Sequence, residues 1–170
     1  MRHLENDPRV YVGTYAKYSV GDLTGAWLIL SEFDSYEEFL EACYGLHTDE
    51  NEPELMFQDI EGEDFGEYCE SDCSRLFACA KACDDSNNPE AVAAYIKLGL
   101  VNDWNNIRRE FDEHYFGYFD SYMELGYYLA QEGGIFSQIP DNLQNYFDFE
   151  AYGRDAAYDF HEFDGYYFWN

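Results

Sequence analysis

Arg-Val-Tyr-Val-Gly-Thr-Tyr-Ala-Lys-Tyr, residues 9–18, is a stretch of β-branched and aromatic residues that predicts a β-strand. A turn signal, Gly-Asp-Leu-Thr-Gly, follows at 21–25, and the short apolar run at 26–30 predicts a second, buried strand. Residues 54–60 predict a third strand. The N-terminal part of the chain is therefore expected to form a small β-sheet.

A helix is expected between the second and third strands. Ser35-Tyr-Glu-Glu38 is a capping-box signature, in which two side chains satisfy free backbone N–H groups at a helix start. The residues that follow are strongly amphipathic, with glutamates on the face opposite the apolar stripe. Sheet and helix together predict an α+β module over residues 1–62. The apolar stripe consists of Tyr36, Phe39, Leu40, Cys43 and Tyr44.

Helical patterns dominate the rest of the chain. Residues 63–103 predict a helical middle module, in which Asn88 and Pro89 form a cap and first-turn pair. Residues 104–170 predict a C-terminal α+β module with several helices and a β-hairpin. The fold class is therefore α+β in about three small modules, and self-repulsion of like charges favours an elongated form. The C-terminal signals are helical stripes at 104–111 and 122–129, a stop at Gly133-Gly134, a short helix after Pro140, and a hairpin turn at Asp164-Gly165.

The chain is strongly acidic. Its 36 Asp and Glu against 9 Lys and Arg give a formal charge of −27. Such chains are often disordered, but aromatic residues make up 20% of this one, enough large rings to build a core. The charge excludes direct binding of nucleic acid, which needs cations to replace counterions, and excludes binding to anionic membranes.

Sequence features also bear on the compartment. No apolar run approaches the ~18 residues that a membrane span needs, and the first residues contain no apolar stretch typical of a signal peptide. Five cysteines, an odd number, fit reduced thiols better than a secreted disulfide framework. We therefore expect a cytoplasmic protein without membrane contact.

The negative charge is unevenly distributed along the sequence. Between Lys17 and Arg75 there are 17 carboxylates and no Lys or Arg. After Arg109 there are 13 carboxylates, and Arg154 is the single basic residue. The middle, from Arg75 to Arg109, holds five of the nine basic residues. Two polyanionic stretches thus flank a less acidic centre.

Four cysteines in the middle module allow two interpretations. Cys69 and Cys73, and likewise Cys79 and Cys83, are spaced by four residues, and four thiolates could hold zinc. The spacing differs from the C-x2-C pairs of common zinc sites, however, and most of these cysteines also fall on one apolar helix face. The favoured interpretation is core packing, with no metal and no cofactor.

No catalytic motif is found. None of the four histidines lies in a Ser or Cys nucleophile motif, and paired carboxylates are unavoidable by chance among 36 acids. The acidic run at 84–88 resembles the start of an EF-hand loop, but Pro89 stands where the loop needs glycine. We therefore expect a protein that is not an enzyme, and a metal-dependent hydrolase is the least favoured hypothesis.

The charge itself supports a different hypothesis, mimicry of DNA. Duplex DNA carries about one negative charge per ~1.7 Å of axis, so 27 charges correspond to ~46 Å, or roughly 13–14 base pairs. A compact chain of this length has a radius of gyration of ~15 Å, so its charge supply is similar to that of a duplex of its own size. A basic, DNA-binding groove would attract it strongly. The alternative is an acidic module that sequesters some other basic DNA-binding protein. The carboxylates predicted to form a DNA-like surface are Glu37, Glu38, Glu41, Asp59, Glu61, Glu63, Asp64, Glu67, Glu70, Asp112, Glu113, Asp120, Glu124, Asp148, Glu150, Asp155, Asp159 and Glu162.

Two segments resemble a known family. Residues 10–18 with Gly21-Asp-Leu-Thr-Gly-Ala-Trp27 are similar to the opening of the ArdA antirestriction proteins. The segment at 139–155, Ile-Pro-Asp-Asn-Leu-Gln-Asn-Tyr-Phe-Asp-Phe-Glu-Ala-Tyr-Gly-Arg-Asp, resembles their C-terminal signature. The likeness covers essentially the whole chain. Its most specific residues are Leu143, Asn145, Tyr146, Asp148, Tyr152, Gly153, Arg154 and Asp155.

The resemblance carries functional implications. It implies an elongated, three-domain homodimer whose surface imitates bent B-form DNA. The implied partner is a type I restriction-modification enzyme, whose methyltransferase core of specificity and modification subunits would be occupied without catalysis, so that restriction and modification are blocked. It also implies carriage by mobile genetic elements.

A segment with few charges is expected to form the dimer contact. The antirestriction segment of the family corresponds to about 125–139, where Glu132 is the only charged residue after Glu124. Its aromatic and aliphatic residues suit a subunit contact better than a DNA-like surface. The predicted contact residues are Leu125, Tyr128, Leu129, Ile135 and Phe136.

Overall fold

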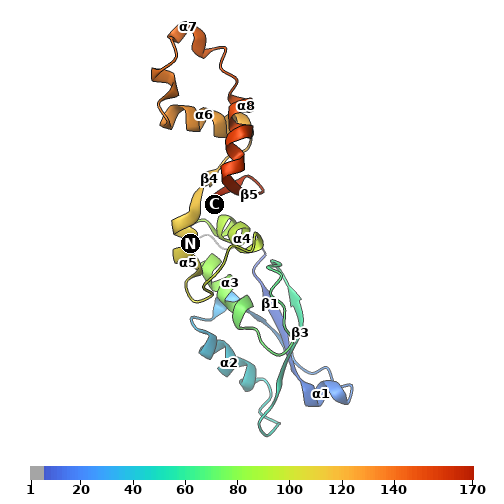
Figure 1. Cartoon of the computed structure of the whole chain (residues 1–170). Coiled ribbons are helices and arrows are strands. Elements are labelled where there is room, and N and C mark those ends of the chain that lie inside the picture. The colour runs from blue at the N-terminus through green and yellow to red at the C-terminus, as the bar shows by residue number, and fades with distance from the viewer. Residues whose placement is uncertain (1–5) are drawn as a thin grey trace. The chain divides into compact units, whose positions relative to one another are not determined.

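The computed structural model describes residues 6–170 and confirms the α+β fold class (Figure 1). Two small antiparallel sheets are combined with several short helices. The chain forms two compact units, which meet in sequence between Arg109 and Glu110. The division into three modules stays a prediction. No helix among the described residues is long and apolar enough to cross a membrane.

The first unit is built on a three-stranded sheet with the strand order β2-β1-β3. All three predicted strands are present, and β1 lies in the centre, where Val10 and Val12 are fully buried. The second strand is half-buried along its whole length, so the prediction that it is buried was wrong. The strands are β1 (Arg9–Thr14), β2 (Ala26–Ile29) and β3 (Leu55–Glu61).

The first predicted strand ends four residues early. A short helix, α1 (Tyr15–Ser19), replaces its last part, because the Thr14 side chain accepts a hydrogen bond from the backbone N–H of Lys17 at 3.2 Å. A threonine in this position caps a helix start, although its β-branched side chain also favours a strand. The prediction of a strand over the whole of residues 9–18 was therefore wrong beyond Thr14.

The capping box at Ser35 starts the predicted helix. In α2 (Tyr36–Gly45) the Ser35 side chain accepts from the backbone N–H of Glu38 at 3.2 Å. Phe39 is fully buried and stacks against Phe57 of β3, with ring centroids 6.0 Å apart. The helix thus covers the sheet with the apolar face that the sequence indicates, and its glutamates are exposed.

The middle of the chain is less helical than predicted. Helix α3 (Ser74–Asp84) begins eleven residues later than the predicted module, and α4 (Pro89–Lys97) follows with Pro89 in its first turn. Cys69 and Cys73 precede α3, so the prediction that both lie on one helix face with Leu76, Ala80 and Cys83 was wrong. The helix α5 (Ile107–His114) begins in the first unit. A short 3-10 turn, η1 (Leu30–Glu32), also belongs to the first unit.

The second unit contains the predicted hairpin. Asp164 and Gly165 both have positive φ angles, 49° and 81°, as a tight two-residue hairpin turn requires. The core of the unit is a cluster of Phe119, Leu125 and Phe160 with Tyr167. The sheet order is β4-β6-β5, with β4 (Tyr115–Tyr118), β5 (Phe160–Phe163) and β6 (Tyr166–Trp169).

Two helices of the second unit cross at a pair of glycines. A Cβ atom added to Gly153 would lie 1.8 Å from the carbonyl oxygen of Tyr122, and one added to Gly126 would lie 2.0 Å from that of Phe149. The backbones therefore approach as closely as they do only because both residues lack a side chain. The helices of this unit are α6 (Tyr122–Glu132), α7 (Asp141–Gln144) and α8 (Phe149–Ala156), with 3-10 turns η2 (Ile135–Ser137) and η3 (Ala157–Asp159).

Candidate interaction surface

Most of the carboxylates predicted to form a DNA-like surface are exposed. The exceptions are Glu63 and Glu67, which are half-buried. The exposed carboxylates are within reach of a partner. Exposure alone does not show which carboxylates could bind a partner, because several of the predicted carboxylates are already paired with cations of the same chain.

Cations of the first unit neutralise three of the predicted surface residues. Arg9 pairs with Glu61, Lys97 pairs with Glu63, and an Nη atom of Arg75 lies 3.5 Å from Glu67. These carboxylates are held by internal ion pairs, which a basic partner would have to break or share. They are therefore weaker candidates for intermolecular contacts than unpaired carboxylates.

The sequence of the second unit is almost free of basic residues of the Lys and Arg type. Its 13 carboxylates share one Lys or Arg, Arg154, whose Nε lies 3.8 Å from Asp155. Both side chains of this pair are largely exposed, so the pair is a weak one.

Several acidic residues of this unit accept hydrogen bonds from backbone N–H groups. Glu124 accepts from Asp120 at 2.8 Å, Asp148 from Ala151 at 2.9 Å and Glu162 from Gly165 at 2.8 Å. Such bonds fix the position of the carboxylate. The second unit therefore carries exposed carboxylates that the fold holds in place, in a sequence with one Lys or Arg, Arg154.

The signature residues shared with the resembling family have structural roles here. Asp148 caps α8, Gly153 provides the close crossing with α6, and Tyr152 packs edge-on against Phe147 at 5.6 Å. Asn145 and Tyr146 are exposed. The signature thus identifies the helix pair that supports the acidic surface. Sequence reasoning missed Gly126, because a lone glycine in a helical pattern gives no sign of its partner.

Of the predicted dimer-contact residues, Leu125 is fully buried in the core of its own unit. Tyr128 is exposed, and Leu129, Ile135 and Phe136 are half-buried. The ring of Phe136 packs against Tyr127 and Phe149 at 5.6 and 5.7 Å. A second copy would therefore meet Tyr128 and the rim of this aromatic cluster, and the dimer contact stays a prediction.

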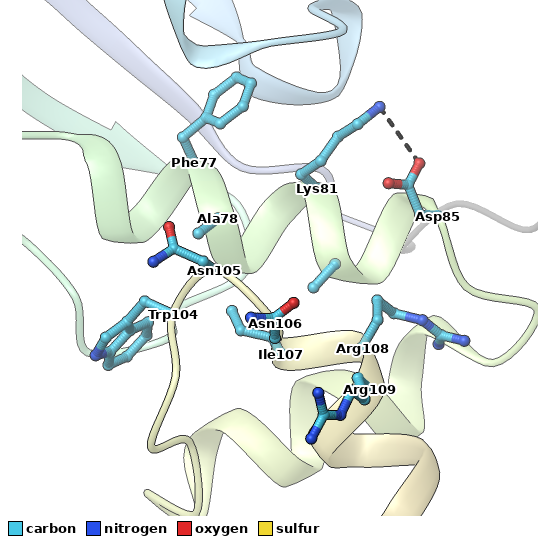
Figure 2. Close-up of a pocket in the computed structure, with 11 residues that line it drawn as sticks. Phe77, Ala78, Lys81, Asp85, Trp104, Asn105, Asn106, Ile107, Arg108 and Arg109 are labelled. Carbon is cyan, nitrogen blue, oxygen red and sulfur yellow. Dashed lines mark ion pairs between the residues drawn. The ribbon is translucent and has the colours of Figure 1, made fainter.

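Basic residues of the middle of the chain line a groove between α3 and the start of α5, shown in Figure 2. The groove has a volume of about 350 Å³. Trp104 lies at one end, with the Arg75 guanidinium 4.9 Å from its ring centroid. At the other end Lys81 pairs with Asp85 at 3.3 Å, and Arg108 donates to Ser86. The Arg108 hydrogen bond joins the start of α5 to the turn after α3, and the Arg75 contact joins α3 to the segment before α5.

Cys73, Cys79 and Cys83 fit core packing better than metal binding, whereas the expectation of core packing was wrong for the exposed Cys69. Cys73 and Cys79 are buried, and desolvation raises the pKa of each thiol to about 12. Cys83 is also buried, whereas Cys69 is exposed, so the four do not share one environment. A low thiolate fraction is unfavourable for a zinc ligand.

One other cluster of metal-ligand side chains exists among the described residues. His47, Asp49 and Glu50 bring their ligand atoms within 4.8 Å of one another. The Lys17 ammonium lies among them, 3.1 Å from His47 Nδ1, 2.9 Å from Asp49 and 3.4 Å from Glu50. An internal cation thus already fills the position where a metal ion would bind. Sequence spacing gave no sign that Lys17 joins this cluster, because Lys17 lies 30 residues from His47.

A family model described as antirestriction protein (ArdA) matches residues 10–168, nearly the whole chain. No curated protein gives a significant match. The match spans both units, including the capped and glycine-crossed helices and the acidic surface that they carry. Members of this family are inhibitor proteins rather than catalysts, which implies an antirestriction function and a restriction enzyme as partner. The chain belongs to the ArdA family of antirestriction proteins.

Proposed function

We propose that this protein mimics DNA and occupies the DNA-binding site of type I restriction-modification enzymes, blocking restriction and modification without catalysis. The observation that carries the proposal is the second unit, with 13 exposed or half-exposed carboxylates and a single Arg. A DNA-binding groove lined by Lys and Arg would exchange phosphates for these carboxylates.

The partner is expected to be the methyltransferase core, made of specificity and modification subunits, since that core binds the DNA. The inhibitor is expected to act as a homodimer through the rim of the aromatic cluster around Phe136. Carriage on a mobile genetic element and action in the cytoplasm would follow from protecting incoming DNA.

Direct competition tests the proposal. Purified protein is titrated into a type I methyltransferase core bound to a fluorescent duplex with its recognition sequence, at low salt. Release of the duplex, with inhibitor affinity that falls as salt rises, is the expected result. Failure to release any duplex at low salt would show that the proposal is wrong.

Two controls separate mimicry from the alternatives. Any single carboxylate substitution such as Asp120→Asn should change inhibition little, because many acidic contacts share the effect; complete loss would indicate a catalytic site. A host lysate passed over immobilised protein should enrich restriction-modification subunits. Enrichment of a nucleoid protein instead would favour the acidic module that sequesters another basic protein.

A further inference from the structure

A groove in the first unit gathers three tyrosines. It lies where α1, α2 and the start of β3 come together, is lined by Tyr15, Tyr36 and Tyr44, and has a volume of about 490 Å³. Leu55 and Phe57 contribute apolar side chains to the same groove. We refer to it as the tyrosine groove. Neither the family match nor the acidic surface described above accounts for it.

Two of the three tyrosines are held in place before any ligand binds. The Tyr36 ring stacks on Phe39 at 5.8 Å, and its hydroxyl donates to Asp72 at 3.4 Å. Tyr15 is anchored by its backbone N–H, which donates to the carbonyl of Glu54 at 3.1 Å. Tyr44 is 49% exposed and forms an open side of the groove. The Tyr36 ring and the Tyr15 backbone are thus held in place, and the groove is accessible on the side of Tyr44.

The electrostatics of the groove favour a cation. Glu52 and Glu54 line it, and no Lys, Arg or His is among the described residues that do. Burial and then the charges of Glu70 and Glu54 raise the pKa of Tyr15, which shows that negative charge surrounds its hydroxyl. Aromatic faces carry partial negative charge as well, so rings and carboxylates act in the same direction.

We propose that the tyrosine groove binds an arginine side chain of the basic partner. A guanidinium is planar, stacks on aromatic faces and donates two parallel hydrogen bonds to a carboxylate, which an ammonium does less well. The inference rests on the proposed function for one point, which is the identity of the partner that supplies the arginine. A DNA backbone offers phosphates but no aromatic recess, so the groove would add a contact that the competing duplex does not make.

Removing one ring without changing the charge tests the groove. Tyr44→Ala keeps the net charge, and so does the control Tyr18→Ala, whose ring is 52% exposed on α1 and does not line the groove. In the DNA-competition assay, Tyr44→Ala should weaken inhibition by roughly tenfold with an unchanged salt slope, and Tyr18→Ala by less than about twofold. Equal inhibition by Tyr44→Ala and the wild type, when the wild type releases DNA, would overturn the groove and leave the mimicry proposal intact.

A second measurement needs no restriction enzyme. Arginine methyl ester is titrated into the full-length protein, and the ring resonances of Tyr15 and Tyr44 are followed by NMR, with lysine methyl ester as comparison. Saturable shifts that are larger for the arginine ester and absent in Tyr44→Ala are expected. Shifts that persist in Tyr44→Ala would show that the groove does not bind the guanidinium. Binding of the ester by a wild type that releases no DNA would support the groove and reject mimicry.

Discussion

Individual side chains of the same type have very different environments in this protein, and the cysteines illustrate this. Desolvation raises the pKa of the Cys43 thiol to about 12, whereas hydrogen bonds from Ser71 lower the pKa of the exposed Cys69. The thiolate is the reactive form, and burial also blocks access. Reactivity should therefore be concentrated in one thiol of five.

We predict that iodoacetamide modifies one cysteine per native chain at pH 7.5 and five per chain in denaturant. A lowered pKa means that Cys69 holds more thiolate at this pH than an ordinary cysteine. Mass spectrometry after peptide digestion checks the site. Cys69→Ser should abolish native labelling; fast native labelling of Cys79 would contradict the buried environment described for it.

A second residue-scale prediction concerns the cation enclosed by His47, Asp49 and Glu50. Lys17→Met removes that cation and leaves the half-buried Glu50 without its ammonium partner, so it should lower the urea midpoint of unfolding. Lys81→Met, which breaks an (i, i+4) pair with the exposed Asp85, is the control and should have little effect. Equal midpoints for the two variants would show that the Lys17 cluster is not stabilising.

The same cluster has a defined pH dependence. A hydrogen bond from Lys17 lowers the pKa of Asp49, and the same bond raises the pKa of Lys17. A lowered carboxyl pKa stabilises the fold above its unfolded value and is lost as pH falls through the folded value. The difference in midpoint between Lys17→Met and the wild type should therefore be constant near neutral pH and shrink in acid. A difference that grows in acid would contradict this assignment.

At the scale of elements, the crossing of α6 and α8 depends on two glycines. Gly153→Ala places a methyl group against the carbonyl of Tyr122, so the helices must separate. We predict a loss of about 2–4 kcal/mol in the free energy of unfolding, typical of severe overpacking. Chemical denaturation measures it. Gly45→Ala at the end of α2, where no atom lies within 4 Å of the added methyl, should cost less than about 0.5 kcal/mol or stabilise.

Much of the element structure could be predicted from local chemistry. The capping box at Ser35, the Pro89 helix start and the Asp164-Gly165 turn each depend on neighbouring residues, and the structure confirms all three. The end of β1 was missed because the β-propensity of residues 15–18 was outweighed by the Thr14 cap. The start of α3 was missed because apolar spacing continues through Cys69, where no helix forms.

The candidate site could be predicted only in part. Surface carboxylates follow from charge and amphipathic pattern, so most of them are exposed as expected. Their internal partners do not follow, because Arg9 and Glu61 are 52 residues apart and meet only through the pairing of β1 with β3. The tyrosine groove could not be predicted for the same reason, because its tyrosines come from two helices that are separated in the sequence.

At the scale of the whole molecule, a net charge describes attraction at a distance but not the contacts of a complex. Screening limits the reach of exposed charges to about 8–10 Å at physiological salt. Within that range, where a carboxylate is already paired with an internal cation, that cation competes with the partner for the carboxylate. Glu150 and Asp159 of the second unit are expected to face this competition least, because Arg154 is the only Lys or Arg in the sequence of that unit.

Two double variants with the same net charge separate these contributions. Glu150→Gln with Asp159→Asn removes carboxylates from the second unit, and Glu61→Gln with Glu67→Gln removes carboxylates that pair with Arg9 and Arg75. Both variants carry two negative charges fewer than the wild type. If unpaired carboxylates replace phosphates in the groove of the enzyme, the first variant should lose more affinity in the competition assay, by about tenfold, and its salt slope should become shallower. The second variant should lose about twofold in affinity, which is the part of the loss that the change in net charge causes. Equal losses would mean that total charge alone drives binding, and a larger loss in the second variant would place the contact surface on the first unit.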